Sequence, residues 1–174
     1  LFKLQNKTAL NIEATSQLEG LEKLVEMAIS EVKGISKNLV PTSLHYHGLI
    51  PALKEVIHAL EGGKAKIYLD AIDVNKRYPE KAELAVFRAL QEMLNNAVKY
   101  AKAESIHVQL AEHEESIVLT VEDDGIGLNP KDIHNGNGLG NTRARAEALG
   151  GTFHIEGAPE KGTLASFEIP ITQK

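Results

Sequence analysis

The chain carries three motifs in close succession: LQEMLNNAVKYAKA at residues 90–103, VEDDGIGL at 121–128 and GNGLGN at 136–141. The first belongs to a helix that we expect over Lys81–Lys102. Its apolar residues fall on one stripe at about 100° per residue, namely Phe87, Leu90, Leu94, Val98 and Ala101. Polar residues at i, i+4 and i+7 occupy the opposite side, namely Glu92, Asn96 and Lys99. A solvated helix face would by itself explain this polar stripe.

The second and third motifs are glycine-rich turns that follow a predicted β-hairpin. The hairpin pairs residues 105–110 with 116–122, and its inward residues alternate with polar ones: Ile106, Val108, Leu110, Ile117, Leu119 and Val121. The third motif opens a helix that we expect over Asn141–Leu149. Nine of the fourteen glycines fall between Gly125 and Gly162. That density indicates a backbone shaped around a bound group, because surface loops rarely need so many residues without a Cβ.

These residue types suit the recognition of a nucleotide. Glycines directly before a helix let backbone N–H groups approach an anion, and the helix amino end adds partial positive charge. A carboxylate at a strand end, Asp123 or Asp124, can accept a hydrogen bond from an amine such as that of adenine, worth roughly 1.5–3 kcal/mol. Asn96 offers a hard oxygen to Mg²⁺, and Glu92 could orient water or accept a proton. Each motif taken alone also fits an ordinary turn or a solvated face.

Further helices and strands are expected outside this region. Apolar residues from Leu18 onward recur at spacings of three and four, which predicts a helix over Gln17–Leu39. This helix either packs on its own domain or pairs with a second copy, and its narrow seam favours pairing. Pro41 ends it. The remaining elements are a helix over Leu49–Leu60 and strands over Lys64–Ala71, Thr152–Glu156 and Thr163–Ile169. We expect a helical domain over residues 1–44 and an α/β domain over 45–174.

Composition and charge exclude several classes of protein. The 174 residues contain no cysteine, which rules out disulfides, thiol chemistry and zinc sites of the Cys type. The formal net charge is -5 with acids and bases interspersed, so we expect no nucleic-acid partner. No apolar run approaches the roughly 18 residues of a membrane span, so we expect no membrane contact within this stretch. The first residue is Leu, and we expect a fragment of a longer cytoplasmic protein whose upstream segments hold any membrane anchor.

Four motifs, in this order, resemble those of the sensor histidine kinases in the GHKL ATPase superfamily. QEMLNNAVKYA at 91–101 is similar to the N box, DDGIG at 123–127 to the G1 box, and GNGLGNTRARAEALGG at 136–151 to the G2 box. KGT at 161–163 is similar to the final Gly-Thr element. The short tether between the glycine motifs resembles the NarX/LiaS/DesK-like subgroup. The resemblance implies a Bergerat ATP-binding fold, a two-layer α/β sandwich with a mixed sheet and helices on one face, preceded by the remnant of a helical hairpin.

The resemblance also implies a role for each matching residue. Glu92 would be the catalytic acid that orients or activates the attacking group, and Asn96 would ligate Mg²⁺. Lys99 would reach phosphate. Tyr100 stands where the family commonly has a His, at a position for a phosphate or lid contact. Asp123 would read adenine. Five glycines would frame the pocket and lid, with Thr163 on the floor: Gly125, Gly127, Gly136, Gly138 and Gly140. Leu128 and Leu139 belong to the same expected site, and Arg143 in the helix that follows would supply positive charge to phosphate oxygens.

The family transfers the γ-phosphate of ATP to a histidine on a dimeric helical bundle, for relay to the receiver domain of a response regulator. The implied partners are therefore ATP, that receiver domain and a second copy of the chain through the N-terminal helices. Among the seven histidines only His113 precedes an acid, and it lies in the expected hairpin turn, so we expect the acceptor upstream of Leu1. Three alternatives are a GHKL-type ATPase, an anti-sigma serine kinase and a non-catalytic ATP-sensing dimerisation module.

Overall fold

The computed structural model describes residues 21, 25, 41–60, 62–74, 76–128 and 137–171. The chain divides into two compact units, Leu1–Val40 and Pro41–Lys174. In the first unit Leu21 and Val25 are helical, with side chains 58% and 56% exposed. The rest of the helix predicted over Gln17–Leu39 lies outside the described residues.

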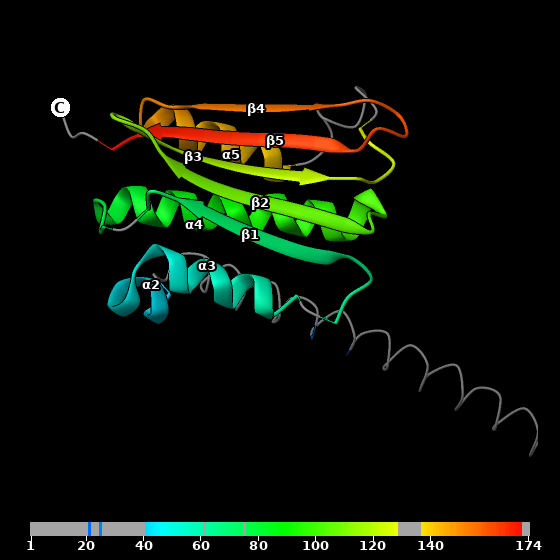
Figure 1. Ribbon diagram of the computed structural model, residues 1–174, viewed down its shortest axis with the longest axis horizontal. Helices are drawn as coiled ribbons and strands as arrows, with labels where there is room; N and C mark the ends of the chain where they lie inside the picture. The colour runs from blue at the N-terminus through cyan, green and yellow to red at the C-terminus, as the bar shows by residue number, and fades with distance from the viewer. Residues whose placement is uncertain are drawn as a thin grey trace, which may run out of the picture. The chain divides into compact units, whose positions relative to one another are not determined.

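The second unit is built on a five-stranded mixed sheet with the order β1-β2-β3-β5-β4 (Figure 1). Its strands are β1 (Lys66–Ile72), β2 (Ser105–Glu112), β3 (Ser116–Asp123), β4 (Thr152–Gly157) and β5 (Thr163–Pro170). β1 runs parallel to β2, and every other neighbouring pair is antiparallel. The strands form where apolar and polar residues alternate, which places one set of side chains on each face.

Helices cover one face of this sheet, as Figure 1 shows for α4 (Glu80–Asn96) and α5 (Asn137–Ala148). Two shorter helices, α2 (Thr42–His47) and α3 (Leu49–His58), precede the sheet and contact α4. The layer between helices and sheet is the core, and its fully buried large side chains include Leu53, Leu90, Leu94, Ile106, Leu110, Leu119 and Phe167. The predicted two-layer α/β sandwich is therefore confirmed, as are the six inward residues of the hairpin.

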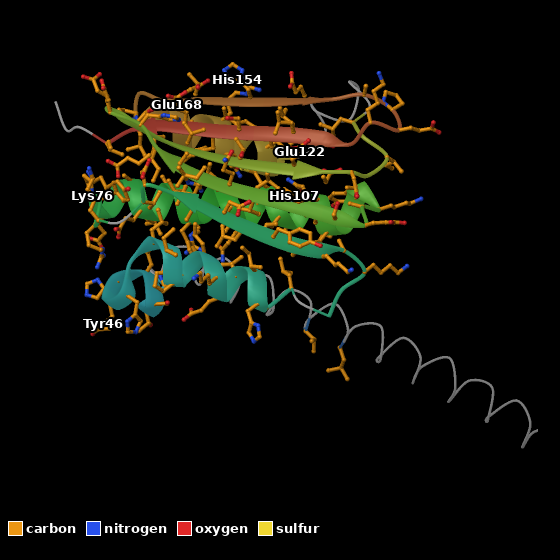
Figure 2. The ribbon with its side chains drawn as sticks, viewed as in Figure 1. Tyr46, Lys76, His107, Glu122, His154 and Glu168 are labelled. Atoms are coloured by element: carbon orange, nitrogen blue, oxygen red, sulfur yellow. The ribbon has the colours of Figure 1, made fainter. Side chains whose placement is uncertain are left out.

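The other face of the sheet is largely polar. Figure 2 shows His107, Glu122, His154 and Glu168 projecting from it. Tyr68 stacks on His107 with ring centroids 4.8 Å apart. Because each of these residues is one step out of phase with the buried set on its strand, the sequence alternation fixes which face meets the helices.

A partly buried ion pair between Arg77 and Glu83 lies where the start of α4 meets the end of α2. Glu83 is 1% exposed and accepts hydrogen bonds from Arg77 Nε at 2.9 Å and Arg77 Nη2 at 2.8 Å. The same guanidinium donates to the carbonyl oxygens of Leu44 and His45. Both carbonyls lie in the last turn of α2, where the Leu44 carbonyl also accepts from the N–H of Gly48 at 3.2 Å. Arg77 therefore adds hydrogen bonds to the end of this helix while it neutralises Glu83.

Three sequence predictions differ from the structure. No helix was predicted at α2, because six residues around His45 and His47 are too few for a periodic pattern. The helix predicted over Lys81–Lys102 is α-helical only to Asn96, and Ala97–Ala101 form a π-helical turn, η1. One extra residue in that turn rotates the following side chains, so Val98 is 41% exposed and does not belong to the apolar stripe.

The third difference concerns the helix predicted over Asn141–Leu149. α5 begins at Asn137, so Gly138 and Gly140 lie in its first turn and not before it. Glycine lowers helix propensity by up to roughly 1 kcal/mol relative to Ala, which is why the sequence favoured a later start. Within the described ranges, no helix combines the length and apolar character needed to cross a membrane.

Candidate functional site

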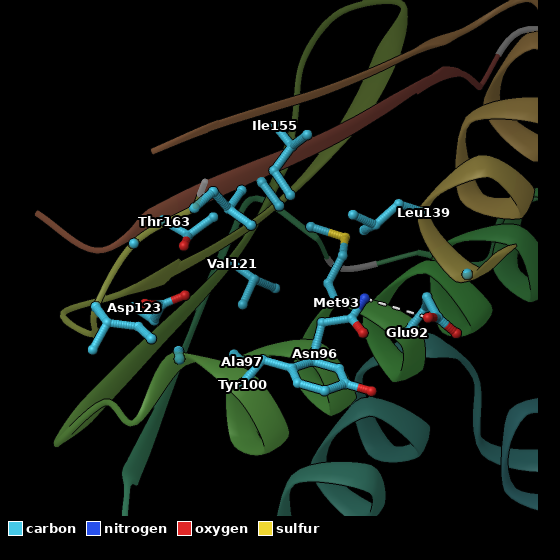
Figure 3. Close-up of a pocket in the computed structure, with 16 residues that line it drawn as sticks. Glu92, Met93, Asn96, Ala97, Tyr100, Val121, Asp123, Leu139, Ile155 and Thr163 are labelled. Atoms are coloured by element: carbon cyan, nitrogen blue, oxygen red, sulfur yellow. Dashed lines mark hydrogen bonds between the residues drawn. The ribbon is translucent and has the colours of Figure 1, made fainter. Parts of the chain in front are cut away.

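A cavity of about 600 Å³ lies between the carboxyl end of α4 and the sheet, with the first turn of α5 at one side. This volume falls within the roughly 300–1,000 Å³ of ligand pockets for small molecules. Figure 3 shows Asp123 at one end of the cavity and Glu92 at the other. The wall between them is mainly apolar and includes Met93, Val121, Leu139 and Ile155.

Asp123 ends β3 and is held inside the cavity wall. Its side chain is 7% exposed, and the backbone N–H of Gly125 donates to its Oδ1 at 3.0 Å. Burial raises the pKa of Asp123 above its usual value, against hydrogen bonds from Gly125 and from the hydroxyl and N–H of Thr163 that act to lower it. A buried carboxylate next to open space is suited to accept a hydrogen bond from a ligand.

Asp124 occupies a different environment from its neighbour. Its Oδ2 accepts a hydrogen bond from the Ser105 hydroxyl at 2.6 Å, and its Oδ1 accepts from the N–H of Glu104 at 2.8 Å. These hydrogen bonds lower the pKa of Asp124, and the bond from the Ser105 hydroxyl has the largest effect. It does not line the cavity. The structure thus answers the question that alternation left open: Asp123 points inward and Asp124 holds the start of β2.

The glycine-rich turn after β3 is packed too tightly for side chains. A methyl group at Gly125 would overlap the carbonyl oxygen of Ala101. That carbonyl ends the π-helical turn and accepts a hydrogen bond from the N–H of Ile126 at 2.8 Å. Gly127 has φ 74°, and a methyl group there would overlap the carbonyl of Ala158. The π-helical turn and these glycines therefore fix the backbone directly beside Asp123.

The opposite end of the cavity carries the polar groups of α4. Asn96 follows Glu92 by one turn, and its Nδ2 donates to Glu92 Oε1 at 3.3 Å (Figure 3). Both side chains are partly exposed and line the cavity with Gly138 and Leu139 of α5. A methyl group at Gly138 would overlap Glu92 Oε1, so α5 approaches α4 as closely as a residue without a Cβ permits.

The structure brings nine of the fourteen residues of the expected site into one lining: Glu92, Asn96, Tyr100, Asp123, Gly127, Leu128, Gly138, Leu139 and Thr163. Gly125 and Gly140 belong to the same turns without lining the cavity. Lys99 is exposed outside the lining, and the Arg143 guanidinium lies 5.9 Å from the centre of the Phe153 ring. Gly136 lies outside the described residues.

Sequence reasoning missed the apolar wall of the cavity. Val121 pairs with Ala165 of β5, and Ala165 pairs with Ile155 of β4, so the three form one row across neighbouring strands. All three line the cavity, with Met93 of α4 facing them. Alternation marked Val121 as inward-facing, and only the strand order shows that it forms a row with Ala165 and Ile155 beside a cavity.

The lining fits Mg-ATP in the chemistry of its two ends. An apolar wall with a buried carboxylate suits a base that carries an amine, and Asn96 offers an amide oxygen, a hard ligand for Mg²⁺, toward the other end of the cavity. In the described ranges, no group of three or more His, Asp or Glu side chains is arranged to hold a metal ion. A magnesium ion with one protein ligand would complete its coordination with phosphate oxygens and water.

Comparison with known proteins identifies the family. Residues 81–173 match the family model described as histidine kinase-, DNA gyrase B-, and HSP90-like ATPase. The histidine-protein kinase/phosphatase DegS of Brevibacillus brevis is 34% identical over 92% of this chain and 42% of its own length. The oxygen sensor histidine kinase NreB of Staphylococcus carnosus is 33% identical over 99% of this chain and 50% of its own. The chain therefore spans about half the length of the curated relatives it matches.

Solved structures agree with this result. The histidine kinase domain of a blue-light activated histidine kinase from Erythrobacter litoralis EL346 superposes with a TM-score of 0.57 at 25% identity, over 68% of this chain and 57% of that one. The Acinetobacter baumannii histidine kinase AdeS, at 18% identity and a TM-score of 0.63, shares the fold over 90% of this chain and 84% of its own. The chain belongs to the histidine kinase-, DNA gyrase B- and HSP90-like ATPases, and the matching residues lie in its second unit, which is an ATP-binding domain of this family.

Proposed function

We propose that this chain forms the kinase core of a two-component sensor, which transfers the γ-phosphate of Mg-ATP to a histidine for relay to a response regulator. The observation that carries this proposal is a single cavity with a buried acceptor, Asp123, at one end and Glu92 beside Asn96 at the other. Such a separation of polar ends suits a ligand whose base and phosphates lie far apart.

Asp123 orients the base in this proposal. Its carboxylate accepts the exocyclic amine of adenine, while the glycines at 125 and 127 keep the neighbouring backbone close to the ring. The apolar row of Val121, Ala165 and Ile155 then excludes water from the face of the base. A base with a carbonyl in place of the amine would give this buried carboxylate no donor from the ligand and would set an acceptor against it, which disfavours its binding.

The end of the cavity lined by Glu92 and Asn96 of α4 binds the phosphates and accepts the proton in this proposal. Asn96 is the protein ligand that we assign to Mg²⁺, which when bound neutralises charge on the phosphate oxygens. In the transfer step an imidazole nitrogen attacks the γ-phosphorus, an N–P bond forms, and the bond to the bridging oxygen breaks to release ADP. Glu92 accepts the proton that the imidazole loses, because its carboxylate lies beside Asn96 at 3.3 Å. We assign Lys99 to phosphate and Tyr100 to a phosphate or lid contact by resemblance, and Arg143 to phosphate by its positive charge in α5.

The acceptor histidine is assigned to a segment other than the catalytic domain described here. His113 is the one histidine followed by an acid, Glu114. The structure places it in the turn between β2 and β3, not on a helix. We further propose that the helix around Leu21 and Val25, both exposed, pairs with a second copy, and that the kinase core works in the cytoplasm.

Transfer in trans tests the proposal. The chain is incubated with γ-labelled ATP, Mg²⁺ and a separate helical-bundle fragment that contains an H-[DE] helix from the same full-length protein. We expect acid-labile phosphate on the bundle histidine and none on this chain, with slower transfer by Glu92→Gln, whose amide cannot accept the proton. Release of inorganic phosphate without transfer would favour an ATPase, and labelling of a serine would favour a serine kinase; either result would contradict the proposal.

A further inference from the structure

The carboxylate of Glu92 touches the amino end of α5 at Gly138. A Cβ built on Gly138 would overlap Glu92 Oε1, so the two groups meet only because Gly138 carries a hydrogen there. A hydrogen bond holds each of the two residues in place. Asn96 Nδ2 donates to the same Oε1 at 3.3 Å, and the Thr142 hydroxyl donates to the Gly138 carbonyl at 3.1 Å within the first turn of α5.

The charges of α4 and α5 favour this contact. The first N–H groups of an α-helix lack intrahelical partners and carry partial positive charge, so an anion near them is stabilised. α5 has twelve residues and no acid in its own first turn. Glu92 therefore provides, from a different helix, the negative charge that this helix end favours.

Nucleotide phosphates would enter the same space. Glu92, Asn96, Gly138 and Leu139 all line one part of the cavity, and the proposed function places phosphates there. Two anions close to one helix end repel each other, and a carboxylate against Gly138 occupies the space in which a phosphate oxygen would accept from the N–H groups of that helix end. The Glu92 carboxylate must therefore leave Gly138 before a phosphate can take its place.

We propose that Glu92 is an internal competitor of the nucleotide phosphates, bound to the amino end of α5 in the empty domain and released when phosphates arrive. This inference rests on the proposed function of the site. It gives the side chain two consecutive roles: it holds α5 against α4 while the cavity is empty, and it becomes free to accept a proton only when phosphates have displaced it. Proton acceptance is thereby linked to occupancy of the phosphate site.

The test compares ligands that differ only in phosphate number. Binding of adenosine, AMP, ADP and ATP with Mg²⁺ is measured by calorimetry or NMR titration for the wild type, Glu92→Gln and Glu80→Gln. Glu80→Gln is the matched control, because it removes the same charge from an exposed residue in the first turn of α4. We expect Glu92→Gln to bind ADP and ATP about two- to fivefold more tightly, with adenosine affinity unchanged and Glu80→Gln equal to the wild type.

A second readout needs no ligand. Amide hydrogen exchange at Leu139 and Gly140 should be faster in ligand-free Glu92→Gln than in the wild type, and ADP should remove the difference. Equal or weaker ADP and ATP binding by Glu92→Gln would overturn the competition while leaving the proposed function standing. Unchanged exchange at Leu139 and Gly140 would do the same. Failure of the wild type to bind any adenine nucleotide would overturn both proposals.

Discussion

Replacing the buried carboxylate of Asp123 by an amide should remove adenine recognition without unfolding the domain. In Asp123→Asn the side chain keeps its shape, and its oxygen can still accept from the Gly125 N–H, now 3.0 Å away. The ligand amine loses a hydrogen bond to a charged acceptor, worth roughly 1.5–3 kcal/mol. At about 1.4 kcal/mol per tenfold, ATP affinity should fall about 10- to 150-fold.

The adjacent acid supplies a matched control. Asp124→Asn removes the same charge one residue along, but Asp124 is bonded to Ser105 and Glu104 and does not line the cavity. Calorimetry should therefore find ATP affinity within about twofold of the wild type for Asp124→Asn, since no contact to the ligand changes. Inosine triphosphate, which has a carbonyl where ATP has the amine, should bind the wild type weakly, and Asp123→Asn should discriminate little between the two nucleotides.

The pH dependence of folding stability gives a second test of the buried Asp123 carboxylate. Because burial raises the pKa of Asp123, its ionised form is less favourable in the folded chain than in the unfolded chain. The stability that the protonated group contributes is present below the unfolded pKa and is lost as pH rises through the raised value. Asp123→Asn should therefore gain stability relative to the wild type across that pH range, measured by denaturant unfolding.

Equal ATP affinity in Asp123→Asn and the wild type would refute the adenine assignment.

The remaining predictions concern the metal, the glycine turn and the N-terminal helix. Asn96→Ala should weaken ATP binding with Mg²⁺ more than without it, because the proposed ligand oxygen is lost; equal loss in both, by calorimetry, would make the residue structural. Gly125→Ala should lower the free energy of unfolding by about 1–3 kcal/mol, since its methyl group would overlap the Ala101 carbonyl; an unchanged denaturation midpoint would contradict that packing. Val25 and Val32 belong to the apolar seam of the helix predicted over Gln17–Leu39. Val25→Glu and Val32→Glu should each shift the chain from dimer to monomer in light scattering, and a monomeric wild type would contradict pairing through this seam.

The sequence predicted the sheet and both layers of the catalytic unit because periodicity reports burial directly. Val108 and Val121 alternate with polar neighbours, and both are buried in the structure. The acid-glycine turn was also recognisable, since Gly125 and Gly127 follow a strand. Such patterns are local, and each is set by the face of one element that meets the core.

Features that depend on contacts between distant segments could not be read from the pattern. The π-helical turn exposes Val98 because the Ala101 carbonyl is diverted to Ile126, twenty-five residues further along the chain. The choice between Asp123 and Asp124 is decided by Ser105 across the sheet, which binds Asp124. The early start of α5 brings Gly138 onto Glu92, and no propensity scale contains that contact.

The central claim is that one cavity binds adenine at Asp123 and the metal at Asn96. The most direct test is a crystal structure of the chain with Mn²⁺ and a non-hydrolysable ATP analogue. Anomalous scattering locates the metal independently of the nucleotide density. We predict the adenine amine within hydrogen-bond distance of Asp123 and the metal on the amide oxygen of Asn96, with Glu92 moved off Gly138. Nucleotide bound elsewhere, for example in the shallow depression between Glu122 and Lys161, would contradict this account.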